Sequence, residues 1–182
     1  IGGGKQTRSL RMVTSDSLEY VFRPVYKAPN LTPVYRGSLM WKIFRDAGSA
    51  SHPAANVVPV PLLKAFGFLQ PNATLVFMPD NPALGEYRKE FAEVLGTLEA
   101  YPSVPKSGRA FAGAVDMLDA EGLLAALNKD ASVRVDTHTL LKIRMVDMLL
   151  GDNDRHADQW RWAQLKKGGM YEPIARDRDK VF

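Results

Sequence analysis

The sequence has no cysteine among its 182 residues, which excludes disulfide bonds, iron–sulfur clusters and thiolate zinc sites. It also has no apolar run near the roughly 18 residues that a membrane-spanning helix needs. The longest candidate, residues 145–150, is interrupted by Asp147. The three histidines, at positions 52, 138 and 156, are too far apart for a paired-histidine zinc site. These absences do not decide the compartment, whether cytoplasm or cell envelope.

What is present indicates a folded protein. Apolar residues make up 46% of the chain, and three of its residues are tryptophan, so a sizeable core can form. The length suits one domain, or two small lobes that share a cleft. Because the chain starts at Ile1 and stops at Phe182, directly after an acidic segment, we expect it to be a fragment of a longer protein.

The charge is unevenly distributed. Residues 1–45 hold eight lysines and arginines against two acidic residues, whereas the remainder holds 16 basic and 18 acidic residues. Cations in one part and carboxylates in another suit a site for a nucleotide and a metal ion. Because aromatic residues are not interleaved with the basic ones, nucleic acid is an unlikely partner.

Periodicity and turn residues predict an α+β fold. We expect a β-hairpin over 9–13 and 19–25, a strand over 74–78, and a second hairpin over 159–164 and 170–175. Helices are expected over 38–47, before Gly67, over 84–99, over 120–127 and over 137–150. The last helix has Asp136 as its expected N-cap and is apolar on nearly every face in its second half, so we expect it to be buried. The stretch 101–108 is rich in proline and serine and predicts a boundary between lobes at 1–100 and 101–182.

Two short acidic segments carry most of the chemistry. Residues 151–159 and 173–179 together contain five carboxylates, one histidine and three arginines, and each segment includes or follows an apolar run. Such charge at the end of a buried element needs compensation, either by a metal ion with phosphates or by a network of salt bridges. In the first segment, Asp154 offers a general base, Arg155 can bind a carboxylate in bidentate fashion, and His156 can orient either group.

Two other interpretations of these segments fail on their spacing. A calcium loop would need glycine where Ala157 stands and glutamate where Ala163 stands. A serine hydrolase of the α/β type would need a G-x-S-x-G motif, which the sequence does not contain. A purely structural loop of Asp–Arg salt bridges remains open. In that case Arg155 would bridge Asp177 or Asp179.

The first segment of the chain offers candidate phosphate ligands. Gly2, Gly3 and Gly4 precede Lys5, and glycine amides followed by a lysine can approach phosphate oxygens, although a flexible linker is equally compatible. The spacing does not match a Walker A loop. Arg23 and Lys27 lie at the end of the second expected strand, where a cation could reach a phosphate or simply face solvent.

The order of these motifs resembles the catalytic core of atypical kinases, namely HipA-type bacterial kinases, phosphoinositide kinases and Golgi secretory-pathway kinases. The resemblance lies in Gly-x-x-Asp-Arg-His after an apolar helix, followed by a hairpin that ends in an aspartate. It implies a two-lobed, kinase-like fold that is truncated at its C-terminus. It further implies ATP with Mg²⁺ or Mn²⁺, and a hydroxyl acceptor on a protein, sugar or lipid. Kinase-like segments of large bacterial envelope proteins are similar as well.

The resemblance also assigns roles to individual residues. Asp154 matches the aspartate that accepts the hydroxyl proton, and His156 matches the histidine of the same loop. Gln159 and Asp177 match metal ligands, with Asp179 as the substitute for Asp177.

Two positions depart from the family pattern. Arg23 stands where Golgi kinases have the lysine that pairs with ATP, and an arginine keeps the charge but not the geometry. Gln159 is a neutral and therefore weaker ligand than glutamate. A degenerate kinase-like binding or scaffold module is thus one alternative to an active enzyme, and a metal-dependent phosphohydrolase is another.

The paired tryptophans have a structural interpretation. In a strand over 159–164, Trp160 and Trp162 share one face, whereas Gln159 and Arg161 share the other. We expect the tryptophans to belong to the core, although a stacking platform for a base or a sugar is the alternative.

Overall fold

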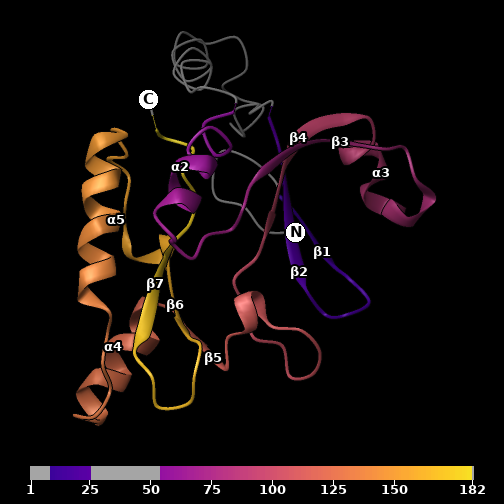
Figure 1. The fold of residues 1–182 in the computed structure, drawn as a ribbon. Helices are drawn as coiled ribbons and strands as arrows, with labels where there is room; N and C mark the ends of the chain where they lie inside the picture. Colours follow the sequence, from indigo (N-terminus) through magenta and orange to yellow (C-terminus); the bar gives the residue numbers. More distant parts are fainter. Residues whose placement is uncertain (1–8, 26–53, 182) are drawn as a thin grey trace, which may run out of the picture.

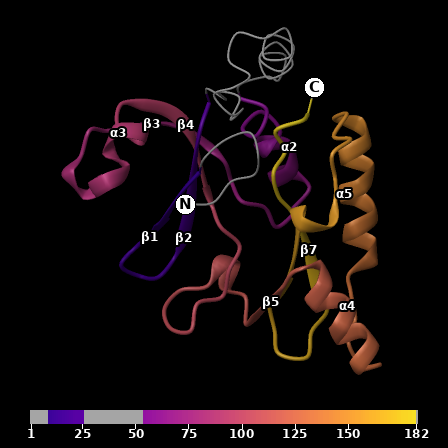
Figure 2. The same cartoon turned by 180° about the vertical axis from the view of Figure 1, so that it is seen from behind.

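The computed structural model describes residues 9–25 and 54–181. These residues form an α+β structure with two antiparallel sheets, as the sequence predicts. Figures 1 and 2 show the second sheet between the first sheet on one side and the helices α4 and α5 on the other. The expected helix over 38–47 lies outside the described residues.

The first sheet has four strands in the order β1-β2-β4-β3. β1 (Leu10–Val13) and β2 (Glu19–Pro24) form the predicted hairpin, and β3 (Thr74–Met78) is also confirmed. The hairpin closes through Thr14, whose amide donates to the carbonyl of Leu18 at 2.9 Å. One face of this sheet buries Phe22 and Phe91, whose rings meet edge to face with centroids 6.2 Å apart.

The expected helix over 84–99 is wrong. The chain instead forms a 3₁₀ segment, η2 (Pro82–Tyr87), one turn of helix, α3 (Arg88–Phe91), and then the strand β4 (Val94–Ala100). β4 pairs with β2 on one side and β3 on the other, so it is central in the sheet. Glu93, with a φ of 58°, turns the chain between the helix and the strand. Hydrogen bonding to two neighbouring strands therefore outweighs the helical spacing of the apolar residues.

The second sheet has the order β5-β6-β7. β5 (Asp116–Leu118) follows the short 3₁₀ turn η3 (Phe111–Gly113), and the predicted hairpin is formed by β6 (Trp160–Gln164) and β7 (Tyr171–Ala175). Trp160 and Trp162 are buried, with ring centroids 5.8 Å apart. Their expected place in the core is confirmed.

Two helices cover this second sheet. α4 (Ala120–Lys129) begins at Asp119, whose carboxylate accepts from the amide of Gly122 at 2.8 Å. α5 (Thr137–Leu149) begins at the predicted cap, Asp136, which accepts from the amide of Thr139 at 2.9 Å. The short helix α2 (Val60–Ala65) contributes Leu63 to the core formed by these helices and the second sheet.

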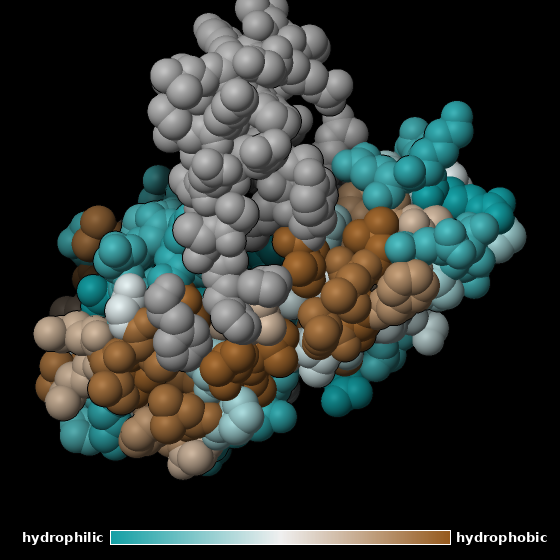
Figure 3. All heavy atoms as spheres, turned by 90° about the horizontal axis from the view of Figure 1, so that it is seen from above, coloured by the Kyte–Doolittle hydropathy of each residue, from teal (hydrophilic) through white to brown (hydrophobic). Residues whose placement is uncertain are grey.

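The expectation that α5 is buried on nearly every face is also wrong. Ile143 and Val146 are buried, but Leu141, Met145, Met148 and Leu149 are exposed. Figure 3 shows hydrophobic side chains on the surface at the side where α5 lies. Within the part of the chain that the structure describes, no helix combines the length and the apolar character that crossing a membrane requires.

Candidate functional site

The first acidic segment is organised around Asp147, a fully buried carboxylate in the last turns of α5. It accepts hydrogen bonds from Arg144 at 3.1 Å and from Arg155 at 3.2 Å, and it also pairs with Arg178. A buried carboxylate is tolerated when guanidinium groups satisfy it. The network of Asp–Arg salt bridges that the sequence leaves open is therefore present.

Arg155 joins the two acidic segments, although not through the expected partners. Its side chain is 1% exposed and bonds to the carboxylates of Asp147 and Asp152 rather than to Asp177 or Asp179. It also donates to the backbone carbonyl of Arg176, which lies directly after β7. Arg155 therefore holds the loop after α5 against the end of β7, and we assign it a positioning role.

Asp147 is the residue that the sequence reasoning missed. Its signal was a single acidic residue inside the apolar run 145–150. The neighbouring Asp152 is also buried, and this burial raises the pKa of its carboxyl group. The charge of Arg155 lowers that pKa, whereas the carboxylate of Asp147 raises it. The two acids lie close together and share one set of guanidinium groups.

The remaining residues of this loop differ in exposure. Asp154 and His156 are exposed, and the Nδ1 atom of His156 lies 3.8 Å from the carboxylate of Asp158. Gln159, at the end of the 3₁₀ turn η4 (Ala157–Gln159), is buried, and its amide oxygen accepts from Arg155 at 3.1 Å. Asp154 is therefore accessible to an acceptor molecule, whereas the oxygen of Gln159 already has a donor.

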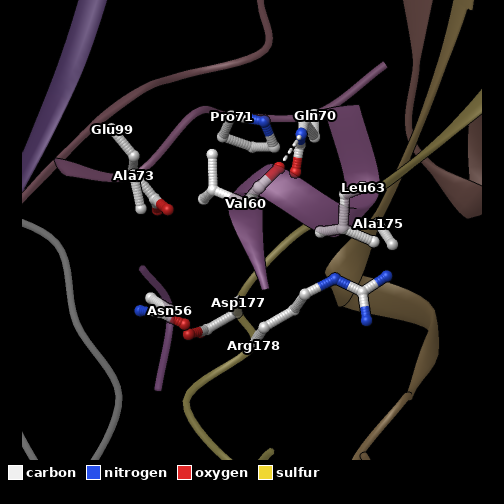
Figure 4. Close-up of a pocket in the computed structure, with 10 residues that line it drawn as sticks. All are labelled: Asn56, Val60, Leu63, Gln70, Pro71, Ala73, Glu99, Ala175, Asp177 and Arg178. Carbon is white, nitrogen blue, oxygen red and sulfur yellow. Dashed lines mark hydrogen bonds between the residues drawn. The ribbon is translucent and has the colours of Figure 1, made fainter. Parts of the chain in front are cut away.

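The second acidic segment reaches a pocket, and Figure 4 shows the side chains that line it. Asp177 enters this pocket from the chain directly after β7, and Glu99 enters it from β4 of the first sheet. Asn56, which precedes α2, also contributes to the polar part of the lining, together with Gln70 and Arg178. The side chains of Asp177 and Asn56 point toward each other in the view. Residues far apart in the sequence thus meet at one place between the two sheets.

Arg23, a candidate phosphate ligand from the sequence, does not line this pocket itself, but its ion-pair partner does. Arg23 on β2 forms an ion pair with Glu99, and the Glu99 side chain is only 6% exposed. This pair was not foreseen, because the sequence placed Glu99 in a helix rather than beside β2. The other candidate phosphate ligands, Gly2, Gly3, Gly4, Lys5 and Lys27, lie outside the described residues.

Asp177 also has an unusual backbone. Its φ is 53°, in the left-handed region, which aspartate tolerates better than most residues but still at a cost. Such conformations often occur where a side chain must be aimed at a ligand. Here the conformation accompanies a carboxylate that lines a pocket.

The oxygen atoms around the pocket could supply some of the ligands that a hard cation needs, but not all of them. Within residues 9–25 and 54–181, no three side chains among His, Cys, Asp and Glu are grouped so that they could hold a metal ion. The pocket does contain the Asp177 carboxylate and the Oδ1 atom of Asn56, which is buried without a hydrogen-bond partner. Mg²⁺ is commonly held by one or two protein oxygens, with water and phosphate oxygens as its other ligands. Asn56 was not foreseen as a ligand, and nothing in its sequence surroundings marks it.

Comparison with known proteins adds no assignment: no family model, no curated protein and no solved structure matches this chain.

Proposed function

We propose that this chain carries a two-lobed, kinase-like domain that transfers a phosphoryl group from ATP to a hydroxyl, with Mg²⁺ or Mn²⁺. The observation that carries the proposal is the pocket shared by Asp177 and Glu99, with the Arg23–Glu99 ion pair at its border. A cation on the first sheet, through its partner Glu99, and an aspartate after the last strand are thus brought near one pocket. A phosphoryl-transfer enzyme needs this pairing, because it acts mainly by positioning groups and balancing charge.

In this proposal each residue has a distinct task. Asp177 and Asn56 would hold the metal ion, which when bound would neutralise charge on the phosphates. Arg23 would orient a phosphate oxygen from the side of the first sheet. Asp154, exposed in the loop after α5, would accept the proton of the acceptor hydroxyl. Arg155 would keep that loop in place through Asp147 and the carbonyl of Arg176.

A degenerate, kinase-like binding module is the second candidate, and two observations favour it. The charge of Arg23 is balanced by Glu99, and the amide oxygen of Gln159 accepts from Arg155. Both groups are therefore less available to a nucleotide or a metal ion. Restoring the family residues with Arg23→Lys and Gln159→Glu separates the two candidates. Transfer that rises in these variants supports degeneration, whereas transfer that falls supports an active enzyme adapted to its own residues.

The proposed function predicts stabilisation by nucleotide. ATP with Mg²⁺ should raise the melting temperature of the unmutated protein, and Asp177→Asn should abolish that rise, because it removes the charged oxygen that would face the metal ion. Differential scanning fluorimetry measures both. Asp158→Asn is the matched control, since its side chain is 96% exposed and it should respond as the unmutated protein does.

A second measurement separates binding from chemistry. Asp154→Ala should keep the rise in melting temperature and lose the transfer of labelled phosphate to any acceptor, because Asp154 acts only on the hydroxyl. If the unmutated protein shows no rise with ATP and Mg²⁺, the proposal is wrong for both the enzyme and the nucleotide-binding module.

A further inference from the structure

Three arginines from both sheets converge on one tyrosine. The guanidinium carbon of Arg11, on β1, lies 4.1 Å from the centroid of the Tyr101 ring, and that of Arg176 lies 4.5 Å from it. Arg161, on β6, donates to the Tyr101 hydroxyl at 3.4 Å. Tyr101 itself directly follows β4, and its amide donates to the carbonyl of Glu19 at 2.8 Å. We refer to Tyr101, Arg11, Arg161 and Arg176 as the Tyr101 cluster.

Within the part of the chain that the structure describes, no ion pair balances the positive charge of this cluster. Among the ion pairs within residues 9–25 and 54–181, none joins a cluster arginine to a carboxylate. Six other arginines of the same residues are paired with carboxylates: Arg23, Arg88, Arg109, Arg144, Arg155 and Arg178. The Nε atom of Arg176 is moreover buried without a hydrogen-bond partner. A buried, unsatisfied donor among like charges costs stability unless a further group compensates it.

The electrostatics of the cluster agree with this imbalance. The pKa of Arg176 is lowered to about 10, mainly by burial and also by the charges of Arg161 and Arg23, against the opposing effect of Tyr101 and Asp177. Burial would raise the pKa of Tyr101, but its hydrogen bond to Arg161 and the charges of the three arginines lower it overall. Both groups thus lie in a positive electrostatic potential, which a bound anion would reduce.

We propose that the Tyr101 cluster binds a phosphomonoester dianion at the junction of the two sheets. Guanidinium groups present N–H donors in a planar fork that matches phosphate oxygens, and a dianion balances more of this charge than a carboxylate does. The ring of Tyr101 sets the spacing of the arginines, and its hydroxyl adds one more donor. The site uses no metal ion and none of the side chains proposed for phosphoryl transfer, and it shares with that proposal only the backbone carbonyl of Arg176, so it stands independently of the proposed function.

A soluble phosphate ester and a lipid headgroup present the same dianion, and the test distinguishes them. Isothermal titration calorimetry on the full chain, in buffer with EDTA and without nucleotide, would use glycerol 3-phosphate and inorganic phosphate. Sedimentation with vesicles of phosphatidylcholine and phosphatidic acid forms the second arm. Saturable binding of one soluble phosphate per chain assigns the site to a soluble ester. Binding to the vesicles alone assigns it to a headgroup.

The variants decide whether the cluster is responsible. Arg11→Gln and Arg161→Gln should each weaken binding at least tenfold, because each removes one charged donor. Arg109→Gln is the matched control, since Arg109 is exposed and already pairs with Asp16 at 3.6 Å. It should bind as the unmutated protein does. Arg11 is exposed on the outermost strand of the sheet, so its variant remains informative even if one at a more buried position fails to fold.

A spectroscopic readout separates a ligand site from simple stacking. Bound phosphate should raise the pKa of Tyr101 in an absorbance titration, because the anion offsets the arginine charges; the Tyr101→Phe spectrum identifies the signal. The proposal is overturned if neither soluble phosphate nor vesicles bind. It is also overturned if Arg109→Gln weakens binding as much as Arg161→Gln, or if phosphate leaves the Tyr101 pKa unchanged.

Discussion

At the scale of single residues, the stability of the loop after α5 depends on Asp147. This carboxylate is fully buried and is the shared acceptor of Arg144, Arg155 and Arg178. Removing its charge leaves two buried guanidinium groups, those of Arg155 and Arg178, to share the single carboxylate of Asp152. Breaking such a buried ion pair destabilises the folded state by more than the intact pair stabilises it, because the remaining charges stay desolvated.

Asp147→Asn should therefore lower the free energy of unfolding by about 3–5 kcal/mol. Urea denaturation followed by tryptophan fluorescence measures this change. Asp158→Asn removes a carboxylate from the same region, but its side chain is 96% exposed, so it should change stability by less than about 0.5 kcal/mol. Equal effects of the two variants would show that the buried network contributes nothing beyond a surface charge.

A second residue-scale effect concerns Tyr171, whose hydroxyl donates to Asp116 on β5. Burial and this hydrogen bond raise the pKa of Tyr171 to about 12. An unfolded tyrosine titrates near 10, so folding favours the neutral phenol. The resulting stabilisation is fully present below about pH 10 and is lost as the pH rises toward 12.

Asp116→Asn should lower the pKa of Tyr171, because it removes the carboxylate that opposes the phenolate. The phenolate absorbance, after subtraction of a Tyr171→Phe titration, reports this pKa directly. A Tyr171 pKa that is the same with and without Asp116 would mean that burial alone accounts for the shift.

At the scale of elements, the sequence predicted both hairpins, β3, and the helices around α2, α4 and α5. Each of these carries a local signal: turn residues between β1 and β2, Gly67 after α2, and Asp136 before α5. The sequence failed at β4, where apolar residues at 87, 91, 94, 95 and 98 imitate a helical face. The decisive information there is tertiary, because β4 is central only once β2 and β3 lie on either side of it.

Gly96 shows that the local sequence pattern does not reveal how closely β4 packs against its neighbour. A Cβ atom at this position would lie 2.3 Å from the ring of Phe22 on the neighbouring strand. Glycine is therefore required by the close packing of β2 against β4 rather than by a turn. The same limit applies to the candidate site, since the sequence identified Asp154 and Asp177 as charged positions but could not show that Glu99 and Asn56 share the pocket of Asp177.

α5 was predicted correctly as a helix and incorrectly as fully buried. Its composition is apolar around most of the circumference, but only the side that includes Ile143, Val146 and Asp147 is buried. Composition reports how apolar a helix is, whereas burial depends on which elements pack against it. The two kinds of position on α5 should therefore respond differently to mutation.

Ile143→Ala should lower the free energy of unfolding by about 2–5 kcal/mol, because it leaves a cavity in the core. Met148→Ala, on the same helix, should change it by less than about 0.5 kcal/mol, because that side chain is 79% exposed. Urea denaturation measures both. A large loss with Met148→Ala would mean that the exposed side of α5 is covered in solution.

At the scale of the whole molecule, the two largest hydrophobic clusters of the described residues lie on different sheets. Leu10, Phe22 and Phe91 form a core on one face of the first sheet. A second core joins the helices α2, α4 and α5 to β6 and β7, with Ile143 among its members. The Arg23–Glu99 pair and the Tyr101 cluster lie where the two halves meet, beside a small apolar cluster that includes Ala163 and Ile174 and against which Ala100 of β4 packs, so the junction is mostly polar. Polar junctions couple two packed units less firmly than a continuous apolar core does.

We therefore expect the two halves to open separately in the native state, as cooperative units often do. Phe91→Ala should accelerate hydrogen exchange in β1, β2 and β3 much more than in α5 and β6, because its ring packs only in the first core. Ile143→Ala should produce the reverse pattern. Hydrogen exchange followed by mass spectrometry resolves these segments as separate peptides. If either variant accelerates exchange equally in both halves, the molecule opens as a single cooperative unit. The mostly polar junction would then couple the two halves as firmly as an apolar core does.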